Sequence, residues 1–421
     1  MTEASTELRA PRGTRDLLPP QSWRWRRVVN LADEIFTAAG YAPIDTPVFE
    51  ATELFERGVG ETSEVVTKQM YTFTDLGGRS LTLRPEGTAP VMRAVLEHGL
   101  ERGRLPVKVS YAGPMFRQER PQKGRYRQFF QVGIEAIGSE APLVDAEVIE
   151  LGVRFYRAAG VDATLLLNSI GHVDPSCRSR YLEILAGFLT DRRADLAAPD
   201  RDRVESNPLR TFDSKEPATV AVMAGAPSIA DHLCPACRDH FDEVQGLLSD
   251  LDVAFTLEPR LVRGLDYYTR TTFEWVAGGL GSQNAVGGGG RYDGLSETLG
   301  GPRLPGIGIA PGIDRILLAL EQGKPYEPPT IRAYVVALGD GAGRPALRLA
   351  TDLRRAGVAT DLDLAGRSMK GQMKDAARSG ARFAIILGDQ EVARGEATVK
   401  DLESGAQRTV AAAEVEALVR P

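Results

Sequence analysis

The sequence predicts a mixed α and β protein with a large N-terminal part and a smaller C-terminal α/β domain. Two apolar runs flank a basic centre between Val107 and Gly138, and this pattern is typical of a β-hairpin. Residues 175–256 are rich in helix patterns and weak in strand patterns, which suggests an inserted helical subdomain. After a linker-like segment at 324–330, strand and helix patterns alternate over roughly ninety residues, as in a compact α/β domain.

Length and composition narrow the class of protein. A chain of 421 residues is longer than one typical core and predicts two or three domains. The net charge of −6 argues against indiscriminate nucleic-acid binding, but it is compatible with a confined basic groove. No apolar run approaches the ~18 residues of a membrane span, and no apolar signal core begins the chain. Three cysteines are too few for a disulfide framework, so we expect a cytoplasmic protein.

A helix and a proline-bearing strand near the N-terminus form a candidate subunit interface. The predicted helix runs from a cap at Ser22 to Ala39, with apolar residues at helical spacing. The strand that follows carries Pro43 and Pro47, which confine it to a sheet edge or a bulge. A helix that only packs on its own domain explains the pattern equally well.

The second strand of the predicted hairpin separates two sets of side chains by alternation. One face carries Phe129, Gln131 and Glu135, and the other is apolar and is expected to lie in the core. The loop before this strand has one carboxylate, Glu119, among five cations: Arg117, Arg120, Lys123, Arg125 and Arg127. Polar groups below a basic rim suit a ligand with phosphates at one end and a hydrogen-bonding group at the other.

Other residues have both a functional and a structural interpretation. Glu86 precedes a predicted helix that starts at Thr88 or Pro90, and a single glutamate at this position is most simply interpreted as a charge that caps the helix. Arg263 lies in an apolar context that is costly unless an anion pairs with it. Arg315 lies in the first turn of a predicted helix, where either an anionic ligand or a salt bridge would explain it. Glycines 287–290 indicate either close approach to a ligand or a bulged strand.

A cysteine- and histidine-rich segment has spacings that could ligate zinc. The candidate ligands are His232, Cys234, Cys237 and His240. Four ligands within nine residues of one helical segment cannot easily close a tetrahedron, because structural zinc sites usually take two pairs from separate elements. The sequence alone therefore favours no metal at this segment.

The assembled motifs resemble the histidyl-tRNA synthetase family of class II aminoacyl-tRNA synthetases over nearly the whole chain. The resemblance rests on PRGTRDLLP at 11–19, TLRPEGTAP at 82–90, MFRQERPQKGRYRQFFQ at 115–131, LVRGLDYY at 261–268, GGGGRYDGL at 287–295 and GIGIAPGIDRILLAL at 306–320. The third of these resembles class II motif 2 in its histidine-specific form, and the last resembles motif 3. LVRGLDYY together with the motif 2 segment is highly specific.

This resemblance implies an α+β fold and a two-part chain. Residues 1–325 would form a class II catalytic core, an antiparallel sheet flanked by helices, with a helical insertion at about 175–256. Residues 331–421 would form a C-terminal α/β anticodon-binding domain. The implied partners are L-histidine, ATP with Mg²⁺, tRNA(His) and a second copy of the chain, bound through the first long helix and Pro47. No tightly bound, protein-ligated metal is expected.

The resemblance also implies roles for individual residues. Arg117 and Arg263 would be catalytic, at the α-phosphate. ATP would bind Arg117, Glu119, Arg125, Phe129 and Arg315. Histidine would bind Glu86, Thr88, Gln131, Glu135, Tyr267, Tyr268 and Tyr292. From their position further out on the loop, Arg120, Gln122 and Lys123 would meet the tRNA. Fixed guanidinium groups suit the charge that develops at phosphate, and a carboxylate facing a phenol suits an imidazole ring.

Two alternatives belong to other functional classes. One is a regulatory paralogue that senses histidine for an ATP phosphoribosyltransferase. Such paralogues typically lack the C-terminal domain and the catalytic arginine, whereas Arg263, Arg315 and residues 331–421 are all present here. The other is a tRNA-binding scaffold without catalysis, and the full set of arginines argues against it.

Overall fold

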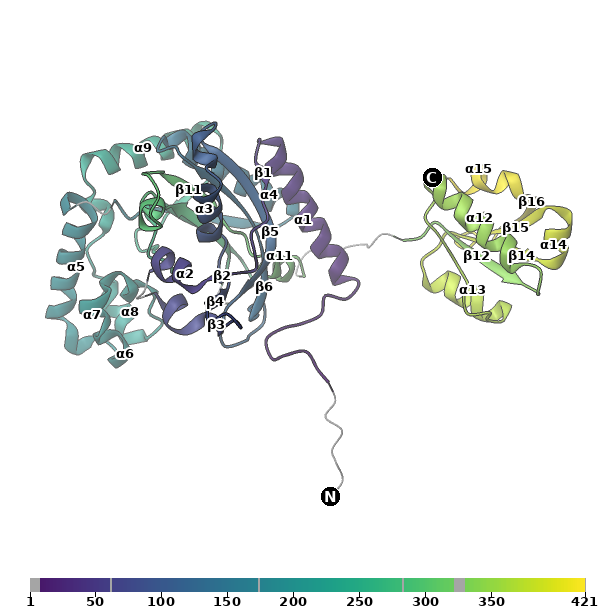
Figure 1. The fold of residues 1–421 in the computed structure, drawn as a ribbon, viewed down its shortest axis with the longest axis horizontal. Coiled ribbons are helices and arrows are strands. Elements are labelled where there is room, and N and C mark those ends of the chain that lie inside the picture. Colours follow the sequence, from purple (N-terminus) through teal and green to yellow (C-terminus); the bar gives the residue numbers. More distant parts are fainter. Residues whose placement is uncertain (1–7, 61–62, 173–174, 282–283, 322–329, 421) are drawn as a thin grey trace, which may run out of the picture. The chain divides into compact units, whose positions relative to one another are not determined.

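The computed structural model describes residues 8–60, 63–172, 175–281, 284–321 and 330–420. The chain divides into two compact units, Met1–Tyr326 and Glu327–Pro421, both visible in Figure 1. Within the described residues, no helix has the length and apolar character that crossing a membrane requires.

The larger unit is built on an eight-stranded sheet with strand order β1-β5-β6-β11-β10-β9-β7-β8. The strands are β1 (Ala42–Pro43), β5 (Val107–Phe116), β6 (Gln128–Ile137), β7 (Ala163–Ser169), β8 (Thr256–Leu257), β9 (Thr269–Ala277), β10 (Ala285–Arg291) and β11 (Gly306–Ile309). Within this order, all neighbouring strands from β5 through β6, β11, β10 and β9 to β7 pair antiparallel. The short strands β1 and β8 pair in parallel at the two edges of the sheet. The predicted antiparallel sheet is confirmed.

The predicted hairpin is the longest strand pair of this sheet. β5 and β6 pair from Val107 opposite Ile137 to Phe116 opposite Gln128, so residues 117–127 form the connecting loop. Val132, Ile134 and Ala136 of β6 lie in the hydrophobic core, as the alternation predicts. Gln131 and Glu135 therefore lie on the opposite face of the sheet.

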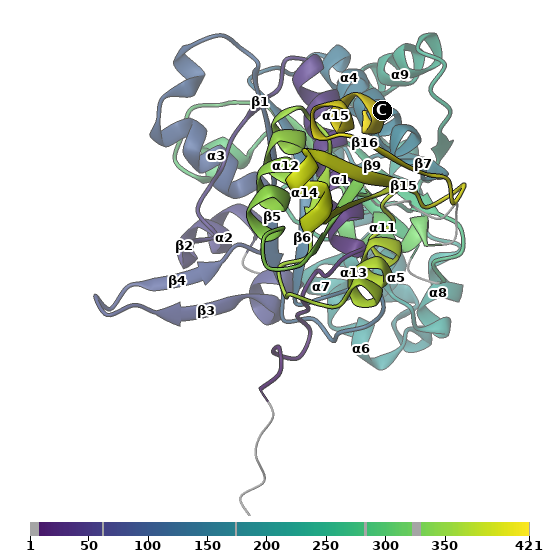
Figure 2. The ribbon, with the colours of Figure 1, turned by 90° about the vertical axis from the view of Figure 1, so that its right-hand side faces the viewer.

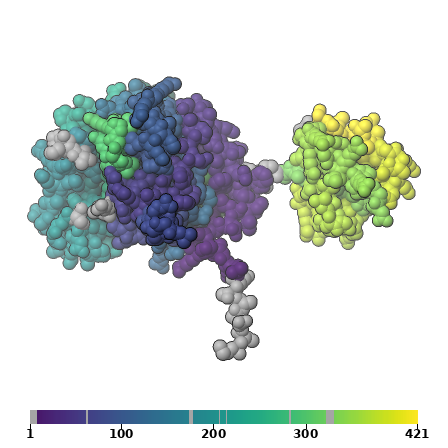
Figure 3. All heavy atoms as spheres, in the orientation of Figure 1, coloured from purple at the N-terminus to yellow at the C-terminus, as the bar shows by residue number. Residues whose placement is uncertain are grey.

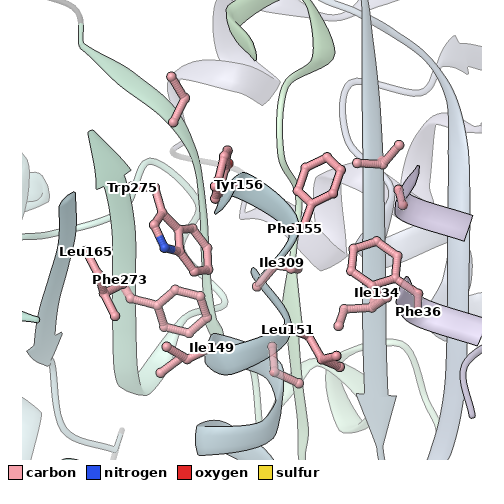
Figure 4. Packing of buried hydrophobic residues seen from close by; sticks show 14 of the residues in the cluster. Phe36, Ile134, Ile149, Leu151, Phe155, Tyr156, Leu165, Phe273, Trp275 and Ile309 are labelled. Atoms are coloured by element: carbon pink, nitrogen blue, oxygen red, sulfur yellow. The ribbon is translucent and has the colours of Figure 1, made fainter. Parts of the chain in front are cut away.

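Four helices border the core beneath the sheet: α1 (Gln21–Ala38), α4 (Pro142–Ala159), α9 (Pro235–Asp250) and α11 (Ile313–Leu320). Figure 4 shows Phe155 and Tyr156 of α4 between Trp275 of β9 and Phe36 of α1. The Trp275 ring lies where a Cβ at position 152 would be, so only glycine fits at that point of α4. This packing holds the central strands at fixed positions under the opposite face.

The first helix begins differently from the prediction. α1 starts at Gln21, directly after Pro20, and no side chain caps it. Ser22 lies inside the helix, so the predicted cap is wrong. The fixed φ of Pro20 allows the chain to enter the helix without a capping side chain. Figure 3 shows the N-terminal region that contains α1 on one flank of the larger unit and the helical insertion on the opposite flank.

A smaller sheet extends from the larger unit. It has strand order β2-β4-β3, formed by β2 (Phe49–Ala51), β3 (Tyr71–Thr74) and β4 (Ser80–Leu83). Figure 2 shows β3 and β4 projecting beyond α2 (Thr52–Val59) and α3 (Thr88–Glu97). α3 starts at Thr88, one of the two predicted starts.

The helical insertion follows β7 and ends with α9. Its other helices are α5 (Arg180–Asp191), α6 (Ala198–Arg201), α7 (Arg203–Ser206) and α8 (Pro217–Met223), with a short helical turn at Pro175–Ser179. They surround a separate hydrophobic cluster that includes Tyr181, Leu185 and Met223. Cys177, Cys237 and Tyr268 belong to the same cluster, so the insertion touches the main sheet through Tyr268, next to β9.

The C-terminal unit is a five-stranded sheet with order β13-β12-β14-β15-β16. Its strands are β12 (Ala333–Leu338), β13 (Thr360–Leu362), β14 (Phe383–Gly388), β15 (Glu396–Asp401) and β16 (Gln407–Ala411), and its helices are α12 (Gly343–Arg355), α13 (Met369–Arg378), α14 (Asp389–Arg394) and α15 (Val415–Val419). β13, β12 and β14 are parallel, and β15 and β16 continue antiparallel. Hydrophobic clusters cover both faces, in agreement with the predicted α/β fold.

Candidate active site

The face of the large sheet opposite the core carries a hollow with two adjoining parts. The smaller part, about 60 Å³, is lined mainly by polar side chains and glycines. The larger part, about 510 Å³, is lined by five arginines, Arg117, Arg125, Arg210, Arg263 and Arg315. Arg117, Gln131 and Arg263 line both parts. The polar pocket and basic rim expected from the hairpin are therefore joined in one cavity.

Glu135 of β6 lies behind the lining of the polar pocket, in contact with Thr88 and Tyr292, which line it. Its buried carboxylate accepts hydrogen bonds from the hydroxyls of Tyr292 (2.6 Å), Thr88 (2.8 Å) and Tyr111 (3.3 Å). Burial raises the pKa of Glu135 to about 8, although these hydrogen bonds oppose the rise. Burial also raises the pKa of Tyr292 well above its usual value, so its hydroxyl stays protonated and donates.

Glu86 caps α3 and also faces the pocket. Its carboxylate accepts the backbone N–H groups of Thr88 (2.6 Å) and Ala89 (2.9 Å) at the start of the helix. It also accepts the Tyr267 hydroxyl at 3.2 Å. Burial raises the pKa of Glu86, and the helix N–H groups act against this shift. The structural interpretation is confirmed, and the same carboxylate lies where a ligand amine could reach it.

The remaining predicted histidine-binding residues line the same pocket. The rings of Tyr267 and Tyr268 are in contact, with centroids 4.8 Å apart. Gln131 donates weakly to the Ala310 carbonyl at 3.4 Å. Within the described residues, its buried Oε1 has no hydrogen-bond donor. A ligand donor would satisfy this oxygen, which otherwise loses its solvation without compensation.

The glycine run at 287–290 is a strand and also the wall of the pocket. It forms most of β10, with irregular pairing to β9 on either side of Gly287–Gly290. A Cβ at Gly288 would lie 2.8 Å from the Arg263 guanidinium, and one at Gly290 would lie 2.8 Å from the Tyr268 ring. Glycine is therefore required here because functional side chains approach the backbone closely.

Arg263 and Arg117 lie between the two parts of the hollow. Arg263 pairs with Glu274 of β9. Burial opposes the charge of Arg263, but Glu274 outweighs it, and the pKa of Arg263 is raised. Among the described residues, its buried Nε has no acceptor. Arg117 donates to the Pro85 carbonyl at 2.9 Å, and its guanidinium lies 5.4 Å from the Phe129 ring centre. Both cations are thus fixed before any ligand arrives.

Arg125 and Arg315 line the outer end of the hollow. Arg125 bonds to the Glu119 carboxylate at 3.2 Å. Arg315 lies in the first turn of α11 and donates to the Ala285 carbonyl at 3.1 Å. Burial lowers the pKa of Arg315, and the charge of Arg125 adds to this effect. Two cations placed close together in this way would be stabilised by an anion between them.

The N-terminal arm braces the loop between β5 and β6. Arg15 forms an ion pair with Asp314 of α11 at 2.6 Å, and its guanidinium lies 4.2 Å from the Tyr126 ring centre. The Arg127 N–H donates to the Gly13 carbonyl at 2.7 Å. Asp314 also accepts the Phe130 N–H at 2.9 Å. The PRGTRD segment therefore supports the loop that carries Arg117 and Arg125.

The three residues predicted to meet tRNA lie on the same loop but outside the hollow. Arg120, Gln122 and Lys123 are exposed, and the lining of the two parts described above does not include them. The Lys123 ammonium lies 3.7 Å from the Glu321 carboxylate. The outer loop is thus accessible to a large partner while the inner loop faces the cavity.

Two contributors to the site were not identified from the sequence. Tyr111 of β5 donates to Glu135, and its ring fills the space beside Gly87 and Gly133. Glu274 pairs with Arg263. Strand alternation on β5 could have placed Tyr111 on the pocket face, because it lies opposite Gly133 in the hairpin. The pairing of Glu274 with Arg263 depends on how the segment before β9 folds back, which no local pattern specifies.

The chain matches known proteins over almost its full length. Residues 13–316 match the histidyl-tRNA synthetase family and residues 332–420 match the anticodon binding domain family. The histidine–tRNA ligase of Moorella thermoacetica is 52% identical over 410 residues, with 96% of each chain covered. That of Nocardia farcinica is 50% identical, covering 100% of this chain and 99% of its own. The crystal structure of apo Staphylococcus aureus histidyl-tRNA synthetase superposes with a TM-score of 0.82 at 38% identity, covering 98% of this chain and 100% of its own.

Proposed function

This chain belongs to the histidyl-tRNA synthetase family, and from that premise we propose that it activates L-histidine with ATP and transfers the histidine to tRNA(His). The observation that carries the proposal is the joined hollow, in which a small polar pocket adjoins a larger basic cavity at Arg117 and Arg263. Glu135 lies behind the pocket and accepts a hydrogen bond from Tyr292, which lines it. The lining of the pocket has the polar groups that an amino acid requires. The larger cavity, about 510 Å³, has the volume and the cations that a nucleoside triphosphate requires.

The polar pocket would recognise histidine at both ends. Glu86 and Thr88 would hold the α-amino group, because a buried carboxylate at a helix start is an acceptor for an ammonium group. Glu135, Gln131 and the hydroxyls of Tyr267, Tyr268 and Tyr292 would surround the imidazole. A side chain that left Glu135 and Gln131 unpaired would be rejected, since buried polar groups without partners cost free energy.

The arginines would make the activation step possible. A carboxylate oxygen of histidine bonds to the α-phosphorus of ATP, and the bond to the bridging oxygen breaks to release pyrophosphate, which leaves with Mg²⁺. Arg117 and Arg263 would neutralise charge at the α-phosphate, while Arg125 and Arg315 would hold the outer phosphates. Phe129 and Glu119 would hold the adenine. Because Arg117 and Arg263 are already fixed by Pro85 and Glu274, little reorganisation is needed.

The transfer step would use both units of the chain. We assign residues 1–325 to the catalytic core and residues 331–421 to anticodon binding, in keeping with the match of 332–420 to the anticodon binding domain family. The exposed Arg120, Gln122 and Lys123 would meet the acceptor end of the tRNA. A terminal ribose hydroxyl of the tRNA then attacks the histidyl carbonyl and AMP leaves. We place this activity in the cytoplasm.

We also propose that the catalytic unit works as a homodimer. Three apolar side chains on and next to the small sheet, Val48, Phe49 and Phe73, are each at least 40% exposed. The rings of Phe49 and Phe73 pack edge to face, with centroids 6.2 Å apart. Exposed neighbouring aromatic rings suit an interface. Light scattering after gel filtration should give twice the chain mass. Phe49→Glu should shift the protein toward the monomer, and Leu251→Glu, at an exposed leucine of the insertion, should not.

The charging reaction tests the proposed function as a whole. The full-length protein should attach radiolabelled histidine to a tRNA(His) transcript in the presence of ATP and Mg²⁺. A transcript of another tRNA serves as the control for tRNA identity. Binding of the tRNA without charging would favour the scaffold alternative instead.

A further inference from the structure

Four potential metal ligands converge at the base of the helical insertion, away from the active site. They are His172, just after β7, Cys177 in the following helical turn, and Cys234 and Cys237 at the start of α9. One imidazole nitrogen and three sulfurs all lie within 4.8 Å of one another. We propose that this cluster is a structural Zn²⁺ site of the Cys₃His type, which fastens the insertion to the edge of the catalytic sheet.

The distances suit a tetrahedral ion. Zinc binds sulfur at about 2.3 Å and imidazole nitrogen at about 2.0–2.1 Å, so ligand atoms around it lie roughly 3.5–3.8 Å apart. His172 Nδ1 is 3.7 Å from Cys234 Sγ and 2.9 Å from Cys237 Sγ. With the upper limit of 4.8 Å, the four atoms bracket the required spacing, and small side-chain rotations bring them to it.

The four ligands come from two separate segments of the chain, which the four candidates within residues 232–240 do not. Cys234 and Cys237 form one pair at the start of α9, and His172 and Cys177 form a second pair in the chain between β7 and α5. Two pairs from separate elements are the usual arrangement of structural zinc sites. The two histidines that flank the cysteines in sequence are not part of the cluster. His240 bonds to Asp145 at 2.8 Å, and the His232 ring lies against Tyr181 with centroids 5.8 Å apart.

The surroundings favour a metal over other uses of the thiols. The Cys234 N–H points at Cys177 Sγ at 3.4 Å, as backbone groups do toward the thiolates of metal sites. A disulfide would use two of the three cysteines and leave the third and the histidine unexplained, whereas Zn²⁺ uses all four. Cys177 and Cys237 are buried, while His172 and Cys234 are half-buried, so an ion can enter from one side.

The position of the cluster connects it to the histidine pocket. Arg178, next to Cys177, donates to the Tyr268 carbonyl at 2.7 Å. Gly171, next to His172, accepts the Arg270 N–H at 2.7 Å, and Arg270 has a φ of +46°. A metal would fix the ends of both contacts and hold the segment that carries Tyr268. The four ligands would thus act as positioning residues for the pocket.

The direct test is the metal content of the full-length protein after expression with added zinc. We expect about one zinc per chain by elemental mass spectrometry. Replacement by Co²⁺ should give the d–d bands of a tetrahedral ion and a thiolate-to-cobalt charge-transfer band. Protein reduced and stripped of metal should recover the same spectrum when titrated with Co²⁺. These measurements use the unaltered chain and do not depend on how variants fold.

Variants locate the ligands. Cys237→Ser and His172→Ala should lose the zinc and lower the melting temperature, and His172→Cys should keep it. His232→Ala is the matched control and should bind zinc like the unaltered protein. An unaltered protein with neither zinc nor a cobalt spectrum would overturn the proposal. So would full zinc content in Cys237→Ser, or an intact mass two hydrogens below the reduced chain together with no metal, which would identify a disulfide.

A positional role predicts one more result, which rests on the proposed function. If the chain activates histidine, removing the metal should raise the KM for histidine several-fold and change kcat less, because Tyr268 binds the substrate side chain. The metal content is measured without activity, so failure of the zinc site and failure of the proposed function are distinguishable.

Discussion

Replacing Glu135 with glutamine should make the larger unit more stable at alkaline pH while weakening histidine binding. Burial raises the pKa of this carboxyl group from 4.5 to about 8. A buried carboxylate that is held ready for a ligand is unfavourable in the free protein, and the neutral amide removes that penalty. Stability and affinity should therefore change in opposite directions.

The sign and size of the stability change follow from the pKa of Glu135 in the unfolded and folded states. The folded pKa is above the unfolded one, so the folded state holds the proton more firmly. The resulting stability is fully present below about pH 4.5 and is lost as the pH rises through about 8. The difference corresponds to at most ~5 kcal/mol. We expect ~2 kcal/mol in practice, because the amide replaces the hydrogen bonds from Tyr292 and Thr88 imperfectly.

The effect on histidine is set by one charged hydrogen bond. Such bonds contribute ~1.5–3 kcal/mol, so the variant should bind histidine about 10- to 150-fold more weakly. Calorimetric titration measures this affinity directly.

Tryptophan fluorescence isolates the stability effect. The three tryptophans, Trp23, Trp25 and Trp275, all lie in the larger unit, so their signal during urea unfolding reports on that unit. The stability gain of Glu135→Gln over the unaltered protein should grow between about pH 5.5 and about pH 8.5. Glu140→Gln removes a carboxylate at an exposed position and is the matched control. Parallel pH profiles for Glu135→Gln and the unaltered protein would refute the reasoning.

Two further predictions separate binding from chemistry. Arg263→Ala should lower the turnover of the activation step by about 100-fold or more while histidine affinity changes less, because the charge of Arg263 acts mainly in the transition state. Stopped-flow kinetics measures the turnover and calorimetry the affinity, and equal losses in both would contradict that role. Deleting residues 331–421 should leave pyrophosphate exchange nearly intact and lower tRNA charging by about tenfold or more; loss of exchange as well would mean that this domain supports the catalytic unit.

The hairpin and its chemistry could be predicted because they depend on local alternation. Strand periodicity predicts Val132, Ile134 and Ala136 in the core, and the structure confirms it. Periodicity also places Gln131 and Glu135 on the opposite face, where Gln131 lines the pocket and Glu135 bonds to Tyr292 of its lining. The glycine run is an irregularly paired strand, as one of its two interpretations predicts, and close approach of a ligand to it stays a prediction. Side-chain direction along a strand needs no knowledge of distant residues.

The convergence of distant residues could not be predicted in the same way. The cysteine cluster joins residues about sixty positions apart, and the histidines that local spacing indicates, His232 and His240, lie outside it. The same applies to Glu274, whose pairing with Arg263 depends on how the chain folds back onto β9. The predicted Ser22 cap is wrong for a local reason, because the helix already begins at Gln21, directly after Pro20. Long-range pairing is a property of the packed fold, whereas periodicity is a property of one element.

Histidine-dependent exchange of pyrophosphate into ATP tests the central claim most directly. The measurement needs only the purified protein, Mg²⁺, ATP, labelled pyrophosphate and one amino acid at a time, and it reports adenylate formation without tRNA. We predict exchange with L-histidine and none above background with glutamine, asparagine or histidinol, because the pocket must satisfy Glu135, Gln131 and the cations that face the carboxylate. Absence of exchange with every amino acid would contradict the account.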